Sequence, residues 1–111
     1  MERRTVSAES QREYDRVANL LAAELGATAG HMMGMPTLYL GGKGFAGMYG
    51  DAMVFKLVGE DHAAAIGLPG ATLFDPSGLG RPMKAWVQLP LQHSSEWPRF
   101  ARAGARGIGN A

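Results

Sequence analysis

Apolar and polar positions follow a strand-like pattern between residues 32 and 58. Three apolar runs of five to eight residues are separated by two breaks that contain glycine, Gly41–Gly44 and Gly50-Asp51. Such breaks favour tight hairpin turns, because glycine adopts left-handed backbone angles without steric cost. The pattern predicts a three-stranded antiparallel meander, and the rest of the chain is organised around it.

Side-chain alternation gives the third run of this meander two partly apolar faces. One face carries Met53, Phe55 and Leu57, and the opposite face carries Ala52, Val54, Lys56 and Val58. A later run alternates in the same way, with Met83, Ala85, Val87 and Leu89 on one face and Lys84, Trp86 and Gln88 on the other. Helices must cover one face. No sequence element remains to cover Val54, Val58 and Trp86, so we expect an interface there.

Helical periodicity precedes the meander. Ser10-Gln-Arg-Glu13 has the capping-box pattern of a helix start. The apolar residues that follow at helical spacing are Tyr14, Val17, Ala18, Leu21 and Leu25. Gly26 fits a left-handed helix end. The pattern predicts a helix up to Leu25, and we expect residues 27–31 to form a loop into the meander.

After the meander, the chain alternates between predicted helices and strands. Glu60–Ile66 is predicted to be a short helix, because its acidic residues lie at the positive N-terminal end. Ala71–Phe74 is predicted to be a brief strand, and residues 83–89 form the returning strand. A last helix is expected to begin at Ser94 or Ser95 and to end at Gly107.

The predicted order is therefore helix, three strands, helix, two strands, helix. It indicates an α+β fold of two layers, with an antiparallel sheet of about five strands and helices on one face. A chain of 111 residues fits a single domain. We expect residues 1–9 and 107–111 to be flexible ends.

Composition narrows the classes of function. The net charge of +1 gives no general attraction to nucleic acid or to an anionic membrane. With no cysteine, disulfides and thiol chemistry are excluded. The N-terminus leads into a polar helix rather than an apolar signal core, and no apolar run approaches the roughly 18–20 residues of a membrane span. We expect a soluble, cytoplasmic protein.

Two segments, in this order, resemble the N-terminal domain of the TfoX/Sxy family. Met33–Ala46 is similar to the family's glycine-rich opening hairpin, and a strand like Val54–Leu57 follows at the expected interval. Gly80–Pro90 is similar to its Gly-Arg-Pro-Met signature and aromatic strand, with a closing helix that has an early tryptophan. The resemblance spans Tyr14 to Ala103.

The resemblance implies a fold like that of secretion chaperones and a relation to regulators of natural competence for DNA uptake. We expect no counterpart here of the family's separate C-terminal helical domain, and the family supplies no catalytic residues for these positions. The function expected on this basis is that of a non-enzymatic regulatory domain acting by protein–protein contact. The partner would be another protein or a second copy, paired through the outer sheet face in a homodimer.

Four residues are the candidates for binding: Lys43, Arg81, Lys84 and Trp86. Cations beside an aromatic ring on a sheet face can hold a nucleic acid or an acidic peptide, although Trp86 can equally serve packing. A second basic face consists of Arg99, Arg102 and Arg106, which also suits a solvated helix end. An alternative function is thus a nucleic-acid-associated transcriptional regulator. A weaker alternative is a small-ligand-binding protein or enzyme with a pocket near Gly78–Pro82.

The sequence predicts no catalytic residue, metal or cofactor. Gly42–Gly47 matches G-x-G-x-x-G, but a strand rather than a helix follows it, so these are turn glycines. The three histidines, His31, His62 and His93, lack the close pairwise spacing of metal ligands. Candidate carboxylates occur in predicted turns or at a helix start, where backbone amides explain them: Asp51, Glu60, Asp61 and Asp75.

Overall fold

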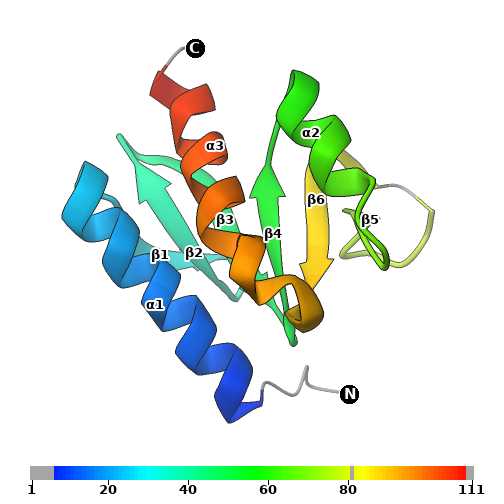
Figure 1. Ribbon diagram of the computed structural model, residues 1–111, viewed down its shortest axis with the longest axis horizontal. Helices are drawn as coiled ribbons and strands as arrows, with labels where there is room; N and C mark the ends of the chain where they lie inside the picture. The colour runs from blue at the N-terminus through cyan, green and yellow to red at the C-terminus, as the bar shows by residue number, and fades with distance from the viewer. Residues whose placement is uncertain (1–6, 81, 110–111) are drawn as a thin grey trace.

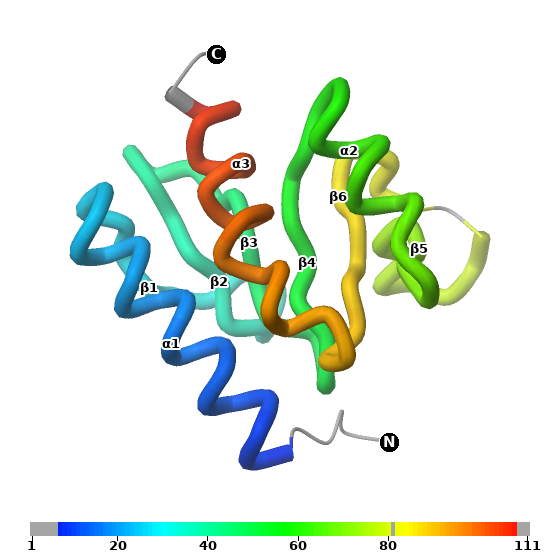
Figure 2. The backbone as a smooth tube through the Cα atoms, in the orientation of Figure 1, coloured from blue at the N-terminus to red at the C-terminus, as the bar shows by residue number. Residues whose placement is uncertain are grey.

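The computed structural model describes residues 7–80 and 82–109, which fold into two layers (Figure 1). The elements in chain order are α1 (Ala8–Leu25), β1 (Thr28–Met32), β2 (Met35–Leu40), β3 (Lys43–Tyr49), β4 (Ala52–Lys56), α2 (Gly59–Ile66), β5 (Thr72–Phe74), β6 (Met83–Pro90), the 3₁₀ helix η1 (Leu91–Glu96) and α3 (Trp97–Gly109). The strands form one antiparallel sheet of six, in the order β1-β2-β3-β4-β6-β5. Helices α1 and α3 lie side by side across one face, and α2 packs near β6 (Figure 2). The predicted α+β, two-layer class is confirmed.

The predicted meander is present as β2, β3 and β4, each paired with the next. Its turns contain Gly41, Gly42 and Gly50, all with positive φ, as the hairpin pattern requires. The predicted helix at residues 60–66 and the strand that precedes the Asp75 loop are also present, as α2 and β5.

The sheet has one strand more than predicted, because residues 28–32 form β1 instead of a loop. β1 pairs with β2 through the two-residue turn Met33-Gly34, in which both residues have positive φ, 52° and 81°. That geometry matches the twist of the flanking strands. β1 lies at the sheet edge and most of its side chains are exposed, so it lacks the alternation that identifies a buried strand.

The first helix is capped by Ser7, so the capping box predicted at Ser10 is wrong. The Ser7 hydroxyl accepts from the Ser10 amide at 3.1 Å, and Ser10 itself is buried in the first turn of the helix. The Ser7 amide donates to a carboxylate oxygen of Asp51 at 2.8 Å, which joins the helix start to the β3–β4 turn. This backbone hydrogen bond, with help from the Ser10 hydroxyl, holds the pKa of Asp51 below its usual range.

The last helical segment also differs from the prediction at both ends. A 3₁₀ helix covers Leu91–Glu96, so α3 begins at Trp97 rather than at Ser94 or Ser95, and it continues past Gly107 to Gly109. Together with the start of α1 at Ala8, this extends helical structure into the segments expected to be chain ends. The side chain of Trp97 is fully buried and anchors the start of α3.

The main core lies between α1, α3 and the sheet. The predicted apolar stripe of α1 is buried at Tyr14, Val17 and Leu21. The large side chains that meet it from α3 and the sheet are fully buried: Phe45, Phe55, Trp97 and Phe100. Gly104 brings α3 against the strands, because a Cβ there would lie 2.9 Å from the Phe45 carbonyl oxygen and 3.2 Å from that of Lys56. The helix backbone therefore rests directly on β3 and β4.

Replacing Tyr14 by phenylalanine is expected to raise the free energy of unfolding by about 1 kcal/mol at pH 7. Among the described residues the buried Tyr14 hydroxyl has no hydrogen-bond partner, and such a group costs about 1–3 kcal/mol. Burial also raises the pKa of this hydroxyl. Above about pH 10 the unfolded chain ionises while the folded one stays neutral, so the wild type loses stability as the pH rises, and Tyr14→Phe removes that loss.

Urea denaturation at pH 7 and pH 10.5 measures both effects. The matched control is Tyr39→Phe, because the Tyr39 hydroxyl donates to the His31 carbonyl oxygen at 2.7 Å. That variant is expected to lose about 0.5–1.5 kcal/mol. Equal losses in the two variants would show that the Tyr14 hydroxyl is hydrogen-bonded in solution.

Candidate functional site

The sheet face opposite the helices is filled by its own side chains. Met35, Val54, Phe74 and Trp86 form a second, small buried cluster there. Val54 is 0% exposed and Trp86 is 7% exposed, so the expectation that this face is left uncovered is wrong for both residues. Val58, in contrast, is 68% exposed, and it lies beyond the end of β4.

Curling of the sheet explains how this face covers itself. The rings of Tyr49 on β3 and Phe74 on β5 meet edge to face with centroids 5.0 Å apart, although β4 and β6 lie between their strands. In a flat sheet, three strand spacings would separate them by about 14 Å. The register between β5 and β6 shifts between Leu73 and Phe74, and such irregularities bend a sheet.

Small residues on the same face let long side chains lie flat across neighbouring strands. A Cβ on Gly47 would lie 2.6 Å from the Met35 Cε atom, and one on Gly30 would lie 3.1 Å from the Tyr39 ring. Near the start of β6, Met83 and Ala85 are partly buried and pack against this outer cluster, whereas Val87 and Leu89 belong to the main core.

The structure describes three of the four predicted binding residues, and it does not join them into one exposed site. Trp86 is buried in the outer cluster, and Arg81 lies outside the described residues. Lys84 is exposed near the start of β6, and its carbonyl oxygen lies 2.8 Å from Nε2 of His62. Lys43 begins β3, with β4 between it and the strand of Lys84. Trp86 thus has a packing role.

The predicted second basic face is paired with carboxylates. Arg99 donates to Glu96 at 3.1 Å, and Arg102 makes two hydrogen bonds to Glu24, at 2.9 and 2.8 Å. The Arg102 hydrogen bonds hold the pKa of Glu24 below its usual range. Arg106 lies 4.0 Å from Asp61. Exposed pairs of this kind add little stability, but they leave little unbalanced positive charge along α3.

The loop that follows β5 is organised by Asp75. One carboxylate oxygen accepts from the Gly78 amide at 3.1 Å and from the Ser77 hydroxyl at 2.8 Å, and the other accepts from the Gly80 amide at 2.9 Å. These bonds shape the turn, as the sequence pattern indicated for this carboxylate. The Asp75 carboxylate is therefore used within the loop near Gly78–Pro82, where the weaker alternative placed a ligand pocket.

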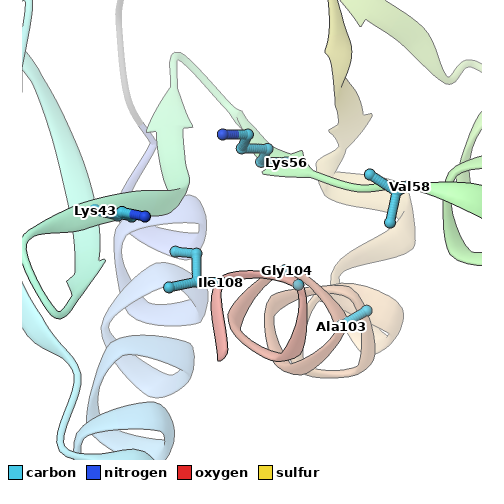
Figure 3. Close-up of a pocket in the computed structure, with 7 residues that line it drawn as sticks. Lys43, Lys56, Val58, Ala103, Gly104 and Ile108 are labelled. Carbon is cyan, nitrogen blue, oxygen red and sulfur yellow. The ribbon is translucent and has the colours of Figure 1, made fainter. Parts of the chain in front are cut away.

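A pocket of about 130 Å³ lies elsewhere, between the last turns of α3 and the adjoining ends of β3 and β4 (Figure 3). The residues that line it are Lys43, Lys56, Val58, Ala103, Gly104, Gly107 and Ile108. Figure 3 shows Lys43 and Lys56 on different strands, with Ile108 of α3 below Lys43. Lys56 is paired with Trp86 in the sheet, so its side chain shares the face opposite the helices. The ion pairs of the described residues leave both lysines without a carboxylate partner.

The close approach of α3 to the sheet creates this pocket. Gly104 brings the helix backbone down onto β3 and β4, and Gly107, one turn later, leaves open space where a side chain would lie. The pocket thus has a short apolar wall from α3, with Lys43 and Lys56 among the residues at its edge. The sequence pattern selected Lys43 for binding and Val58 as part of an uncovered face, but it did not select Lys56, whose signal was a charge at the end of an otherwise apolar run.

The histidines and acidic residues do not form a metal site in residues 7–80 and 82–109. His93 lies 2.6 Å from the Pro69 carbonyl oxygen through its Nε2 atom, as His62 lies against Lys84, so both rings contact the backbone. Within the same ranges, every helix is too short or too polar to cross a bilayer.

Fold and site define this chain at the level of a class: a two-layer α+β domain with a lysine-rimmed pocket at one end of its sheet. Comparison with known proteins finds no family model, no curated protein and no solved structure that matches it. The resemblance to the TfoX/Sxy family therefore stays a prediction from two sequence motifs.

Proposed function

We propose that this chain is a non-enzymatic interaction domain that acts by contacting another protein, as its resemblance to the TfoX/Sxy N-terminal domain implies. The contact surface is the end of the sheet around Lys43, Lys56 and Val58. The observation that supports it is the placement of two lysines, which pair with no carboxylate of the described residues, near a valine that is 68% exposed. A partner with an acidic group next to an apolar one complements this surface.

Another protein is favoured over a second copy of this chain. A symmetric contact places the same patch of each copy against its mate, so a dimer centred on the pocket would bring four lysines together. The outer sheet face, the other surface considered for self-association, has Val54 and Trp86 buried within one chain. A role in the regulation of competence rests on the family resemblance alone.

A nucleic-acid-associated regulator is the second candidate. The arguments against it are the carboxylate partners of Arg99 and Arg102 and the burial of Trp86, which removes its ring as a stacking platform. Retention on a nucleic-acid column that falls steeply with salt would favour this candidate.

Affinity enrichment followed by quantitative mass spectrometry tests the proposal. The baits are the wild type, Lys43→Glu/Lys56→Glu and a matched control, Lys84→Glu, whose side chain is exposed on another strand. We expect specific protein partners that survive nuclease treatment, persist with the control and are lost with the double variant. Partners retained equally by all three baits would place the contact elsewhere. Partners that disappear with nuclease would point to nucleic acid.

A further inference from the structure

We propose that a second copy of this chain binds along the open edge of the sheet, where β1 of one copy pairs antiparallel with β1 of the other. The twofold axis passes beside Gly30, and the two sheets join into one. This inference goes beyond the proposed function. The two surfaces are separate, because β2 lies between β1 and the strands that carry Lys43 and Lys56.

The backbone of β1 offers hydrogen-bonding groups at this edge. Met32 and Met35 flank a two-residue turn, so they form a hydrogen-bonded pair. Bonded and non-bonded pairs alternate along an antiparallel ladder, so Ala29 and His31 belong to non-bonded pairs, and their amides and carbonyls point away from β2. The Tyr39 hydroxyl donates to the His31 carbonyl oxygen at 2.7 Å, and this oxygen has a second lone pair for another donor.

The spacing of these groups suits a symmetric pair of strands. With Gly30 opposite Gly30 of the second copy, Ala29 lies opposite His31, and these two residues exchange both of their backbone hydrogen bonds. The twofold axis repeats the pair, so the outward amides and carbonyls of Ala29 and His31 are bonded in both copies. A Cβ on Gly30 would lie 3.1 Å from the Tyr39 ring. Glycine on both strands at the axis therefore leaves room for the two rings.

Charge does not oppose this contact. No Asp, Glu, Lys or Arg occurs between Glu24 and Lys43, so β1, its turn and β2 carry no charged side chain. Edge strands are commonly protected by charged residues or kept very short. The opposite edge is short, because β5 has three residues. β1 has five residues and lacks charge, so two copies meet there without like-charge repulsion.

Exposed apolar side chains lie at both ends of β1. Leu25 at the end of α1 is 44% exposed, and Met33 in the turn after β1 is 72% exposed. Antiparallel pairing about Gly30 places Met33 of one copy opposite Ala27 of the other, close to Leu25 in the sequence, so both ends gain apolar contact. Met33 also has a φ of 52°, at a turn position where asparagine or glycine is ordinarily found. The turn itself therefore does not account for a methionine there.

Light scattering behind size-exclusion chromatography, over about 1 µM to 1 mM protein, measures the association. We expect the wild type to form a dimer and no larger species, since a twofold contact closes on itself. Ala29→Pro removes an amide that the β1–β2 ladder does not use, so it should keep the fold and weaken the dimer at least about tenfold. Ala29→Ser retains the amide and should dimerise as the wild type does.

Met33→Asn tests the same contact without a proline in the strand. Asparagine followed by glycine is the favoured sequence for this turn, so the variant should melt at or above the wild-type temperature when both are monomeric. It loses the apolar contact at each end of the joined strands, and we expect its dimer to be about tenfold weaker.

Cysteine cross-linking tests the register, because the chain has no cysteine of its own. Ala29→Cys mixed with His31→Cys should give a disulfide-linked dimer on oxidation, since the Cα atoms of a hydrogen-bonded pair lie about 5.5 Å apart. Either variant alone should cross-link poorly, because its two introduced thiols occupy diagonal positions whose Cα atoms are about 7–8 Å apart.

Four results would overturn the inference. A monomer over the whole concentration range excludes the second copy, and a dimer that Ala29→Pro leaves unchanged excludes the β1 edge. Equal cross-linking of the single variants and of the mixture excludes the register about Gly30. A monomeric wild type whose captured partners are lost with Ala29→Pro would assign the edge to a strand of another protein. Partners captured through Lys43 and Lys56 are independent of the first three results, so the two proposals fail separately.

Discussion

Replacing Phe74 by alanine is expected to lower the free energy of unfolding by about 3–5 kcal/mol, the range for a large aromatic side chain removed from a core. The Phe74 side chain is 0% exposed although its strand has three residues and lies at the sheet edge. Its ring contacts Tyr49 across two intervening strands, and it completes the outer cluster with Val54 and Trp86. Because a domain of this size is stable by about 5–15 kcal/mol, the loss is a large share of the total.

Urea denaturation followed by circular dichroism measures this effect, with Leu79→Ala as the control. Leu79 lies in the loop after β5 and is 77% exposed, so its truncation should change stability by less than about 0.5 kcal/mol. If Phe74→Ala cost as little as the control, the outer face would be open in solution, and its apolar residues would again be available for an interface. Light scattering on both variants would then show whether the oligomeric state changes.

Replacing Gly104 by alanine is expected to destabilise the fold by about 1–3 kcal/mol, although the same change in a free helix would stabilise it by about 0.5–1 kcal/mol. The new methyl group would lie 2.9 Å from the Phe45 carbonyl oxygen and 3.2 Å from the Lys56 carbonyl oxygen. Both contacts are with backbone atoms of central strands, which cannot rotate away as a side chain can. Helix α3 must therefore lift off the sheet, and the apolar contacts of Phe100 and Trp97 weaken with it.

Gly107→Ala isolates the packing effect from helix propensity. It lies one turn further along α3, and no described residue beyond its own helix backbone and chain neighbours comes within 4 Å of its Cβ position. We expect it to raise the unfolding free energy by about 0.5–1 kcal/mol, opposite in sign to Gly104→Ala. Thermal and urea unfolding of the two single variants compare them directly. Stabilisation by both substitutions would mean that α3 does not approach the strands as closely as described.

Alternation of side chains was enough to predict the central part of this fold. β2, β3 and β4 each bury one face against helices, so Met53 and Phe55 repeat with period two and glycines interrupt them at the turns. β1 had no such signal. It lies at an edge, and a strand with little to bury need not carry large apolar residues at alternate positions.

The face of Trp86 could be predicted, but its exposure could not. Alternation correctly placed Trp86 and Val54 on the same side of the sheet, opposite the helices. Its burial depends on the curl that brings Phe74 to Tyr49, two residues of strands that are not adjacent in the sheet. Such curvature arises from register shifts and small residues acting together, and a local pattern does not reveal it.

The sequence pattern predicted one of the residues that line the pocket. Lys43 was selected as one of the cations that could bind a ligand beside an aromatic ring, and it lines the pocket instead. Lys56 and Ile108 are far apart in the sequence, and they meet because Gly104 allows α3 to touch β3 and β4. For the arginines of α3, the sequence pattern overestimated the free positive charge. Their spacing suggested a basic face, while their partners Glu24 and Asp61 come from other helices.

The hydrogen bond from Tyr39 to His31 has a consequence for solubility. His31 is paired with Pro36 on β2, and proline has no backbone N–H to donate. The two residues therefore form a non-hydrogen-bonded pair of the antiparallel ladder. In such a pair the His31 carbonyl points away from β2, toward the open edge of the sheet. An exposed edge of this kind can recruit a strand from another molecule and begin fibril-like growth. The Tyr39 ring crosses Gly30, and its hydroxyl donates to the His31 carbonyl oxygen, so one acceptor of this edge is satisfied within the chain. A strand that paired with this edge would have to share that acceptor and pass the ring.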